Sequence, residues 1–551
     1  MPVIRKLCGR LRSESGFTTI VALGVLGITG LLVTGVFAAA RGDLRLGQRD
    51  IDSKRAYYAA RAGVQKFLFH LNQNSNHWQD CPEQTKIAVP GSSTEQFEYQ
   101  PVPANGAPDC DPANPIPTMI DTPTGTFRMR FVGYSGSGTN EVKRALVAGF
   151  RRGTPIDYLW YTTFETLDPV TYPKPWGTTD YNLCGKYRRD PDPRPSQDFN
   201  NGFCSEINWI NGDVVNGPMY THDQFRICAN STGTPKFGRT NDRIESTSPG
   251  ATTNPPGAPA LYRGPGCSAF DPDDVLRTNT LVEGAQEISP PSNNTGLLTD
   301  AQDFGEVFEG VTTIVLSGNT ATVTNDLNDD GVIQPGAPET RVLNTDAEQI
   351  IYVTNEADVG CSSAYNPYQV VYANTGGCGD VYVRSSGNYT SSLTIGSAND
   401  IIINGDVTTN LNGPAMLGLV ANNFVRVQHA VSGRPTPGQH GNCDSAANTS
   451  PTHIDLDIHA AVLALNHSFI VDNYDCGNRL GDLTVYGAIA QKFRGTVGTG
   501  GNVTGYLKKY TYDDRLAVGQ PPYMFNIADA NWHIERETSC VVGGLDPAAS
   551  C

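Results

Sequence analysis

The sequence predicts an α+β protein, in which one long N-terminal transmembrane and amphipathic α-helix precedes a mainly-β exported body that includes a parallel β-solenoid. Three observations support this prediction. Residues 17–40 contain no charge, and residues 41–74 contain no proline. The rest of the 551-residue chain is rich in Gly, Pro, Asn, Thr and Ser, a composition that favours strands and turns.

Length and charge limit the classes of function. The chain is long enough for several packed cores or for one elongated β domain. Its net charge of −16, with no long Lys/Arg run after residue 62, argues against a nucleic-acid partner, because phosphate contacts need a basic face. We expect the acidic surface to serve solubility.

The uncharged run is long enough to cross a bilayer. As a helix its 24 residues span about 36 Å, more than a hydrocarbon core of about 30 Å. Cations ahead of the run are opposed only by Glu14, which predicts a cytoplasmic N-terminus and an exported body. These cations are Arg5, Lys6, Arg10 and Arg12.

Two cleavage sites are compatible with this segment. An ordinary signal peptide would be cut after the small residues 38–40, which removes the helix. The basic leader 1–16, however, ends in Gly16 directly before Phe17 and the apolar run. This SESGF segment resembles the processing site of type IV prepilins. The resemblance implies that a prepilin peptidase cuts after Gly16, methylates Phe17 and leaves the helix attached.

Residues 17–76 are predicted to form one transmembrane and amphipathic spine helix. Segment 54–63, KRAYYAARAG, resembles the N-terminal region of PilX-type minor pilins, in which an A-x-x-A-A-x-A-G pattern recurs and Glu is usual where Arg61 stands. Small residues allow close helix packing in a filament core or a membrane bundle. A stripe of apolar residues at spacings of three, four or seven extends the pattern: Leu44, Ile51, Tyr58, Val64, Phe67, Leu68 and Leu71.

One position departs from the pilin pattern. Major pilins carry Glu at the fifth mature position, where it neutralises a neighbour's N-terminal ammonium, and here that position is Val21. The resemblance therefore implies a minor subunit, at the tip or in priming, in the bacterial cytoplasmic membrane and at the cell surface or in a pilus. Its partners would be other pilin subunits and the assembly machinery. A plain single-pass anchor that is never cleaved or assembled is the alternative.

The exported body is expected in four parts. Residues 77–154 form a small β-rich pilin-like head with two strands between Gly125 and Arg152, and residues 155–379 form an irregular β-rich region with long loops. Residues 380–545 are a solenoid-like repeat region, and 546–551 a tail. The repeat rests on AND at 398–400 and ANN at 421–423, 23 residues apart, with Asn466 about two periods later. It is similar to β-helical ectodomains behind PilX-like N-termini. A β-sandwich is the alternative.

The cysteines indicate an oxidising compartment. Cys8 lies in the leader, and the other twelve are an even number without any C-x-x-C pair. We expect sequence neighbours to form disulfides: Cys81 with Cys110, Cys184 with Cys204, Cys228 with Cys267, Cys361 with Cys378, Cys443 with Cys476, and Cys540 with Cys551.

Calcium is the one cofactor that the sequence suggests. Asp326, Asn328 and Asp330 precede a glycine in the D-x-N-x-D-G form of a calcium loop, and Val332 would offer its carbonyl. The twelfth position is Ala337 instead of a carboxylate, although Glu339 could replace it. A hairpin turn needs the same residue types, so it is the alternative.

Catalytic motifs are missing from the sequence, and we expect no enzymatic activity. The alternating residues His453, Asp455, Asp457 and His459 would share one face of a strand and could bind a metal or act as acid and base, but a half-buried strand alternates in the same way. Aromatic residues 160, 161, 172 and 176 could stack on sugars or close onto the core.

The sequence therefore favours a structural and interaction protein. We expect a minor pilin-like subunit that displays a disulfide-bonded β-rich ectodomain for assembly, priming or adhesion to surface carbohydrate or to a host or abiotic surface. The alternatives are a membrane-anchored adhesin and a β-helix enzyme acting on polysaccharides.

Overall fold

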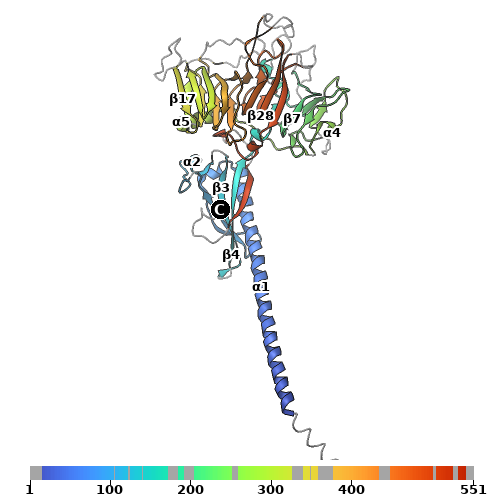
Figure 1. The fold of residues 1–551 in the computed structure, drawn as a ribbon, viewed down its shortest axis with the longest axis vertical. Helices are drawn as coiled ribbons and strands as arrows, with labels where there is room; N and C mark the ends of the chain where they lie inside the picture. Colours follow the sequence, from blue (N-terminus) through green and yellow to red (C-terminus); the bar gives the residue numbers. More distant parts are fainter. Residues whose placement is uncertain are drawn as a thin grey trace, which may run out of the picture. The chain divides into compact units, whose positions relative to one another are not determined.

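A computed structural model describes residues 15–104, 106–121, 125–138, 141–171, 184–190, 204–250, 258–278, 280–325, 339–347, 349–357, 361, 377–432, 447–499, 504–524 and 532–540. The chain forms two compact units (Figure 1). Unit 1 contains Met1–Met119, Arg128–Gly149 and Ile534–Cys551, and unit 2 contains Ile120–Phe127 and Phe150–His533. Most of unit 2 is therefore an insertion in the chain of unit 1.

Unit 1 begins with α1 (Ser15–Gln73), one unbroken helix drawn in blue in Figure 1. No proline interrupts these residues, and Ala and Leu, which favour helices, are frequent. The hydroxyls of Thr29 and Thr34 donate to the carbonyl oxygens of Val25 and Gly30, at 2.7 and 2.8 Å. These hydroxyls are therefore satisfied inside the helix, as an apolar environment requires.

Unit 1 also contains a sheet with the strand order β1-β2-β3-β4-β30. The pairs β1–β2 and β2–β3 are antiparallel. The strands expected between Gly125 and Arg152 are β3 and β4. The bounds of the elements are η2 His77–Asp80, β1 Gln84–Ala88, β2 Gln96–Val102, α2 Pro115–Met119, β3 Phe127–Ser135, β4 Val142–Arg152 and β30 Trp532–Cys540.

The last turns of α1 pack on this sheet at very short range. Ala56 and Ala60 are fully buried. A Cβ atom at Gly133 of β3 would lie 2.0 Å from the carbonyl oxygen of Ala56 and 2.3 Å from the backbone nitrogen of Ala60. Further along, the rings of Phe67 and Phe131 meet edge to face. Small residues on both elements are thus what lets the helix approach its sheet.

Unit 2 consists mostly of short strands. The strands and helices are η4 Pro155–Asp157, β5 Trp160–Phe164, η5 Pro169–Thr171, β6 Trp209–Ile210, β7 Val214–Asn216, β8 Met219–Thr221, β9 Phe225–Cys228, β10 Lys236–Phe237, β11 Ile244–Ser246, β12 Leu261–Arg263, α4 Pro272–Val275, β13 Leu281–Glu283, α5 Thr295–Phe304, β14 Glu306–Glu309, β15 Thr312–Gly318, β16 Thr320–Asn325, β17 Glu339–Asn344, β18 Ile350–Thr354, β19 Val381–Tyr389, β20 Leu393–Ser397, β21 Ile401–Ile403, β22 Leu417–Ala421, β23 Val425–Val427, β24 His429–Ser432, β25 Ala447–Thr452, β26 Leu456–Ala464, β27 Phe469–Val471, β28 Arg479–Phe493, β29 Gly505–Tyr512 and η6 Asp514–Ala517.

Two sheets dominate the described part of unit 2. The first has the order β13-β11-β8-β5-β28-β26-β22-β20-β18-β14, and the second β17-β16-β15-β19-β21-β23-β27. The first is parallel throughout, and the second is parallel from β15 to β27. From β20 to β28 the chain visits the two sheets alternately, apart from the β24–β25 hairpin. The apolar core contains residues of both sheets.

The register sets the length of one circuit through both sheets. Leu393 pairs with Leu417 in the first sheet, and Ile401 pairs with Val425 in the second, so this circuit has 24 residues. The spacing of 23 in the sequence indicated a repeat near this length, and the circuit is one residue longer. As a result Asn399 is the neighbour of Asn423, whose side-chain amide donates to the amide oxygen of Asn399 at 2.6 Å.

The chain enters and leaves unit 2 in the middle of its first sheet. It runs from β5 outward through β8 and β11 to β13, continues through α5 to the opposite end at β14, and returns to β28, which pairs with β5. The boundary expected at residue 380 lies inside this sheet. The sequence places residues 532–540 in the repeat region 380–545, whereas the strand β30 that they form belongs to the sheet of unit 1.

Four expected disulfides are present in the described residues: Cys81–Cys110, Cys184–Cys204, Cys228–Cys267 and Cys361–Cys378. Cys476 and Cys540 are also disulfide-bonded. Their expected partners, Cys443 and Cys551, lie outside the described residues.

Candidate functional site

The first half of α1 presents an exposed apolar surface. Every residue from Thr18 to Asp50 is exposed. Among the described residues, Thr18–Gln73 is the one helix long and apolar enough to cross a membrane. Exposed apolar residues on this scale mark a membrane or protein contact.

From the end of the charge-free run onward, α1 carries an exposed apolar stripe at a spacing of seven. We call Phe37, Leu44, Ile51 and Tyr58 the heptad stripe, and their exposed fractions are 64%, 74%, 46% and 65%. Residues seven apart lie on nearly the same side of a helix. The stripe thus extends one apolar face from the membrane segment toward the sheet.

The helix stripe predicted from the sequence combined two different faces. Leu44, Ile51 and Tyr58 are exposed, whereas Val64, Phe67 and Leu71 are buried. The face that packs on the sheet also includes small residues that hydropathy alone does not identify: Ala56, Ala59, Ala60 and Gly63. Of these, Ala56 and Ala60 lie against Gly133, and Gly63 lies against Phe97 and Phe131, so they contact the sheet of unit 1.

Arg61, the residue that departs from the PilX-type pattern, has a partner in the same unit. Its Nε atom lies 3.3 Å from Oε2 of Glu537 in β30. The spine helix is therefore linked by charge to the last strand of the sheet. Partial exposure of both side chains makes this a modest contribution to stability.

The expected processing residues lie at the start of α1. The helix begins at Ser15, so the backbone of Gly16 and Phe17 is in its first turn, and processing at this site stays a prediction. Val21 is on the exposed part of the helix.

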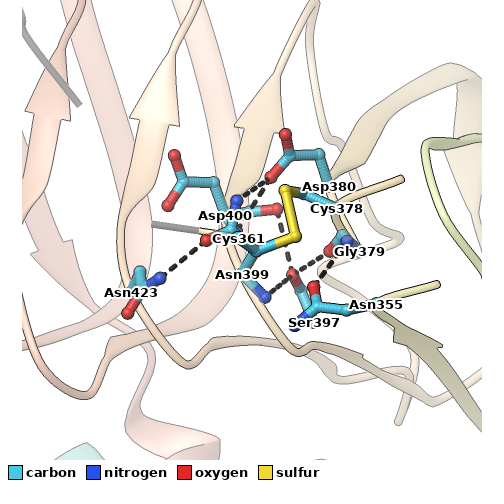
Figure 2. Close-up of a disulfide and its surroundings, with 9 residues drawn as sticks. All are labelled: Asn355, Cys361, Cys378, Gly379, Asp380, Ser397, Asn399, Asp400 and Asn423. Carbon is cyan, nitrogen blue, oxygen red and sulfur yellow. Dashed lines mark hydrogen bonds between the residues drawn. A yellow bond between two sulfur atoms is a disulfide. The ribbon is translucent and has the colours of Figure 1, made fainter. Parts of the chain in front are cut away.

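A polar ladder runs along one corner of unit 2 beside the Cys361–Cys378 disulfide (Figure 2). The side-chain amide of Asn399 donates to Oδ1 of Asp380 at 2.6 Å, and Asn423 donates to Asn399 in turn. On the next circuit the side-chain amide of Asn466 donates to the carbonyl oxygen of Asn422 at 2.8 Å. Each circuit thus satisfies polar groups of its neighbour, which explains why Asn recurs in the sequence.

Charged residues continue this corner. We call Asp380, Asp400, Arg426 and Asp472 the corner cluster. The Arg426 guanidinium donates to Asp400 and, with two nitrogens, to Asp472, at 3.1 to 3.2 Å. Burial and the neighbouring Asp400 raise the pKa of Asp380 to about 6, and burial also raises the pKa of Asp400. Sequence spacing could not reveal this cluster, because its members belong to different circuits.

A second ionic cluster lies where β5 meets β28, and we call it the seam pair. The fully buried Arg494 and Glu165 are 3.1 Å apart. The indole nitrogens of Trp160 and Trp209 donate to the two oxygens of the same carboxylate, each at 3.1 Å. The seam pair escaped the sequence analysis because its two members are far apart in the chain.

The alternating segment 453–459 forms no common site. Asp455 has φ of 55° and lies before β26, and its carboxylate accepts the N–H of Asp482. Within β26 Asp457 is exposed, while Nδ1 of His459 lies 3.1 Å from the backbone nitrogen of Thr409. The expected shared face fails because the left-handed residue breaks the alternation. Among the described residues no group of three His, Cys, Asp or Glu side chains could hold a metal.

Of the remaining candidate residues, two lie among the described residues and the others do not. Trp160 and Tyr161 are buried in the core, so they offer no sugar-stacking surface. Residues 172 and 176 lie outside the described residues. The calcium candidates Asp326, Asn328, Asp330 and Val332 also lie outside them, and calcium binding stays a prediction.

Comparisons with known proteins give little independent information. No family model and no curated protein matches the chain. Among solved structures, the chain is similar to the competence-associated pilin ComZ from Thermus thermophilus, with 11% identity and a TM-score of 0.30. The match covers 89% of this chain and 97% of that chain. A TM-score of this size does not establish a common fold, so the functional argument rests on the chain itself.

Proposed function

We propose that this chain is a membrane-anchored, pilin-like subunit that displays unit 2 outside the cell. One observation carries the proposal. α1 is a single 59-residue helix whose first half is apolar and exposed, and whose last turns are buried on a β-sheet. Such a helix can anchor in a membrane or among other helices while it remains fixed to a folded head.

We further propose that the chain is a minor subunit, which acts at the tip or in priming. Val21 supports this role, because a carboxylate at that position would otherwise pair with a neighbour's ammonium in an apolar core. The heptad stripe supplies the surface for lateral contact with the helices of other pilin subunits. Cleavage after Gly16 by a prepilin peptidase belongs to the same proposal.

Unit 2 is proposed to be a parallel β-solenoid used for display. Two observations support this interpretation: the chain alternates between two mainly parallel sheets, and the polar ladder links neighbouring circuits. Its disulfides would stabilise the body in an oxidising compartment, where it could contact a surface or a partner subunit.

Incorporation into filaments tests the assembly role. The change is Leu44→Asp, which places a charge in the heptad stripe, and the matched control is Leu46→Asp, an equally exposed leucine of the same helix on its opposite side. We expect the Leu44→Asp chain to remain in the membrane fraction while its amount in sheared filaments falls at least tenfold. The Leu46→Asp chain should enter filaments at the wild-type level. Equal incorporation of both variants into filaments would refute the role of the heptad stripe in assembly.

A membrane-anchored adhesin is the second candidate, because α1 alone provides an anchor. It predicts wild-type protein in membranes and none in sheared filaments. For the enzyme alternative, loss of carbohydrate turnover on substitution of Asp455 or Asp457 stays the discriminating result.

A further inference from the structure

The sheet of unit 1 is completed by β30, the last strand among the described residues. α1 and strands β1 to β4 all precede the insertion, whereas β30 follows it. In the strand order β30 is the outer neighbour of β4. Without β30, the 11-residue strand β4 would be an open edge with buried apolar residues such as Leu146 and Ala148. Such an edge is a site for non-native pairing.

The two ends of the insertion are held together within unit 2. We call Phe127, Phe150, Arg152 and Trp532 the end cluster. The ring of Phe127 lies 5.3 Å from that of Phe150 and 5.0 Å from that of Trp532, measured between centroids. The Arg152 guanidinium lies 5.0 Å from the Trp532 ring. In addition, the Arg151 guanidinium donates to the carbonyl oxygens of Leu516 and Ala517, at 3.0 and 2.8 Å. A folded insertion therefore brings the start of β30 beside the end of β4.

An unfolded insertion would separate these ends. The entropic cost of closing a loop grows with the logarithm of its length, so pairing of β30 with β4 across a disordered insertion carries a cost that folding of the insertion removes. Once β30 is in place, an ion pair adds to the strand pairing: Arg61 of α1 pairs with Glu537.

We propose that the pairing of β30 with β4 is a folding checkpoint, in which the head of the subunit closes only after the displayed body has folded. A subunit with an unfolded body keeps an open β4 edge and lacks the charge contact between β30 and α1. The order of folding does not depend on the role of the chain. The consequence, that defective subunits stay out of filaments, rests on the proposed function.

Regional hydrogen exchange on the full-length protein in detergent tests this checkpoint. Leu419→Asp places a charge in the core of unit 2, at a fully buried position of β22. Arg494→Met is a second substitution in the same unit, and we expect it to destabilise unit 2 less. The matched control is Val342→Asp, because Val342 lies in β17 of unit 2 and is 66% exposed.

We expect exchange in β4 and β30 to accelerate at least tenfold in Leu419→Asp, and less in Arg494→Met, in step with exchange in β22 and β26. The β2–β3 pair should keep its protection, and Val342→Asp should match the wild type. Unchanged protection of β4 and β30 with an unfolded body would overturn the proposal. Equal loss across all five strands would also overturn it, because the two units would then fold as one. Since exchange is measured on the isolated subunit, either failure is distinguishable from a failure to enter filaments.

Discussion

The two units bury their interiors by different means. In unit 1 a helix reaches its sheet through alanines and a glycine, and the contact depends on shape. In unit 2 the turns of stacked circuits must satisfy many polar groups, and buried charges such as the seam pair and the corner cluster do so. The comparison teaches that unit 1 should be sensitive to added volume, and unit 2 to unbalanced charge.

The largest effect is expected at the seam pair. Arg494→Met keeps much of the side-chain volume but leaves Glu165 as a buried, uncompensated carboxylate. Removing one member of a buried ion pair costs about 3 to 5 kcal/mol. We expect a loss of this size in the free energy of unfolding of unit 2, measured by regional hydrogen exchange in β26 and β28.

The control for the seam is a surface pair of the same unit. Asp514 lies 2.7 Å from Arg239 and is 71% exposed, so Asp514→Asn should change stability by less than about 1 kcal/mol. Adding Glu165→Leu to Arg494→Met should recover part of the loss, because the stranded charge is removed. If the double variant is no more stable than Arg494→Met, the contribution of the seam pair to stability comes from packing and not from charge.

In unit 1 the sensitive position is Gly133. Its added Cβ in Gly133→Ala would meet backbone atoms of α1 at 2.0 and 2.3 Å, which cannot move as a flexible side chain can. We expect a cost toward the upper end of the roughly 1 to 3 kcal/mol typical of overpacking. Gly149→Ala in β4 is the control, since its Cβ would come no closer than 3.9 Å to the nearest neighbouring atom. Equal thermal midpoints for the two variants would contradict the close-approach account.

A smaller, pH-dependent effect is expected in the corner cluster. The folded state raises the pKa of Asp380 from 3.8 to about 6 and so binds its proton more tightly than the unfolded chain does. The neutral carboxyl therefore stabilises the fold at low pH, and this contribution is lost as the pH rises from about 4 through about 6. Asp380→Asn keeps an acceptor for the Asn399 amide and the N–H of Asp400 without the charge.

Denaturant unfolding of Asp380→Asn and the wild type at two pH values measures this effect. We expect equal stability near pH 4 and an advantage of about 1 to 2 kcal/mol for the variant near pH 7.5, after allowance for the partial exposure of the group. Asp346→Asn is a suitable control, because hydrogen bonds to Asn319 and Ser391 lower the pKa of this exposed carboxyl and its ionised form is favourable. A variant that is less stable than the wild type near pH 7.5 would show that Arg426 holds Asp380 ionised.

Local patterns predicted the parts of the fold that depend on local sequence. Hydropathy and the absence of proline predicted α1, and the neighbouring positions of the cysteines predicted the four disulfides observed. The Asn repeat indicated a period near 23 residues, and the register of the paired strands gives 24. Asp455 defeated the first half of the alternating pattern, since this left-handed residue lies before β26, whereas Asp457 and His459 lie within the strand.

Contacts between residues far apart in the chain could not be predicted from the sequence. Glu165 and Arg494 meet only because the chain starts and ends unit 2 in the middle of one sheet. The assignment of β30 to unit 1 similarly depends on the whole insertion between β4 and β30. In both cases no local signal accompanies the contact, because each residue has an ordinary sequence environment and the partner is supplied by topology.

The most direct test of the central claim is the mass of the mature N-terminus, determined in both membrane and sheared-filament fractions. The proposed subunit requires that α1 stay attached after the leader is removed. We therefore predict a methylated Phe17 as the first residue of the protein in filaments. An intact Met1, or a first residue beyond Ala40, would contradict the account and favour an anchored adhesin or a secreted protein.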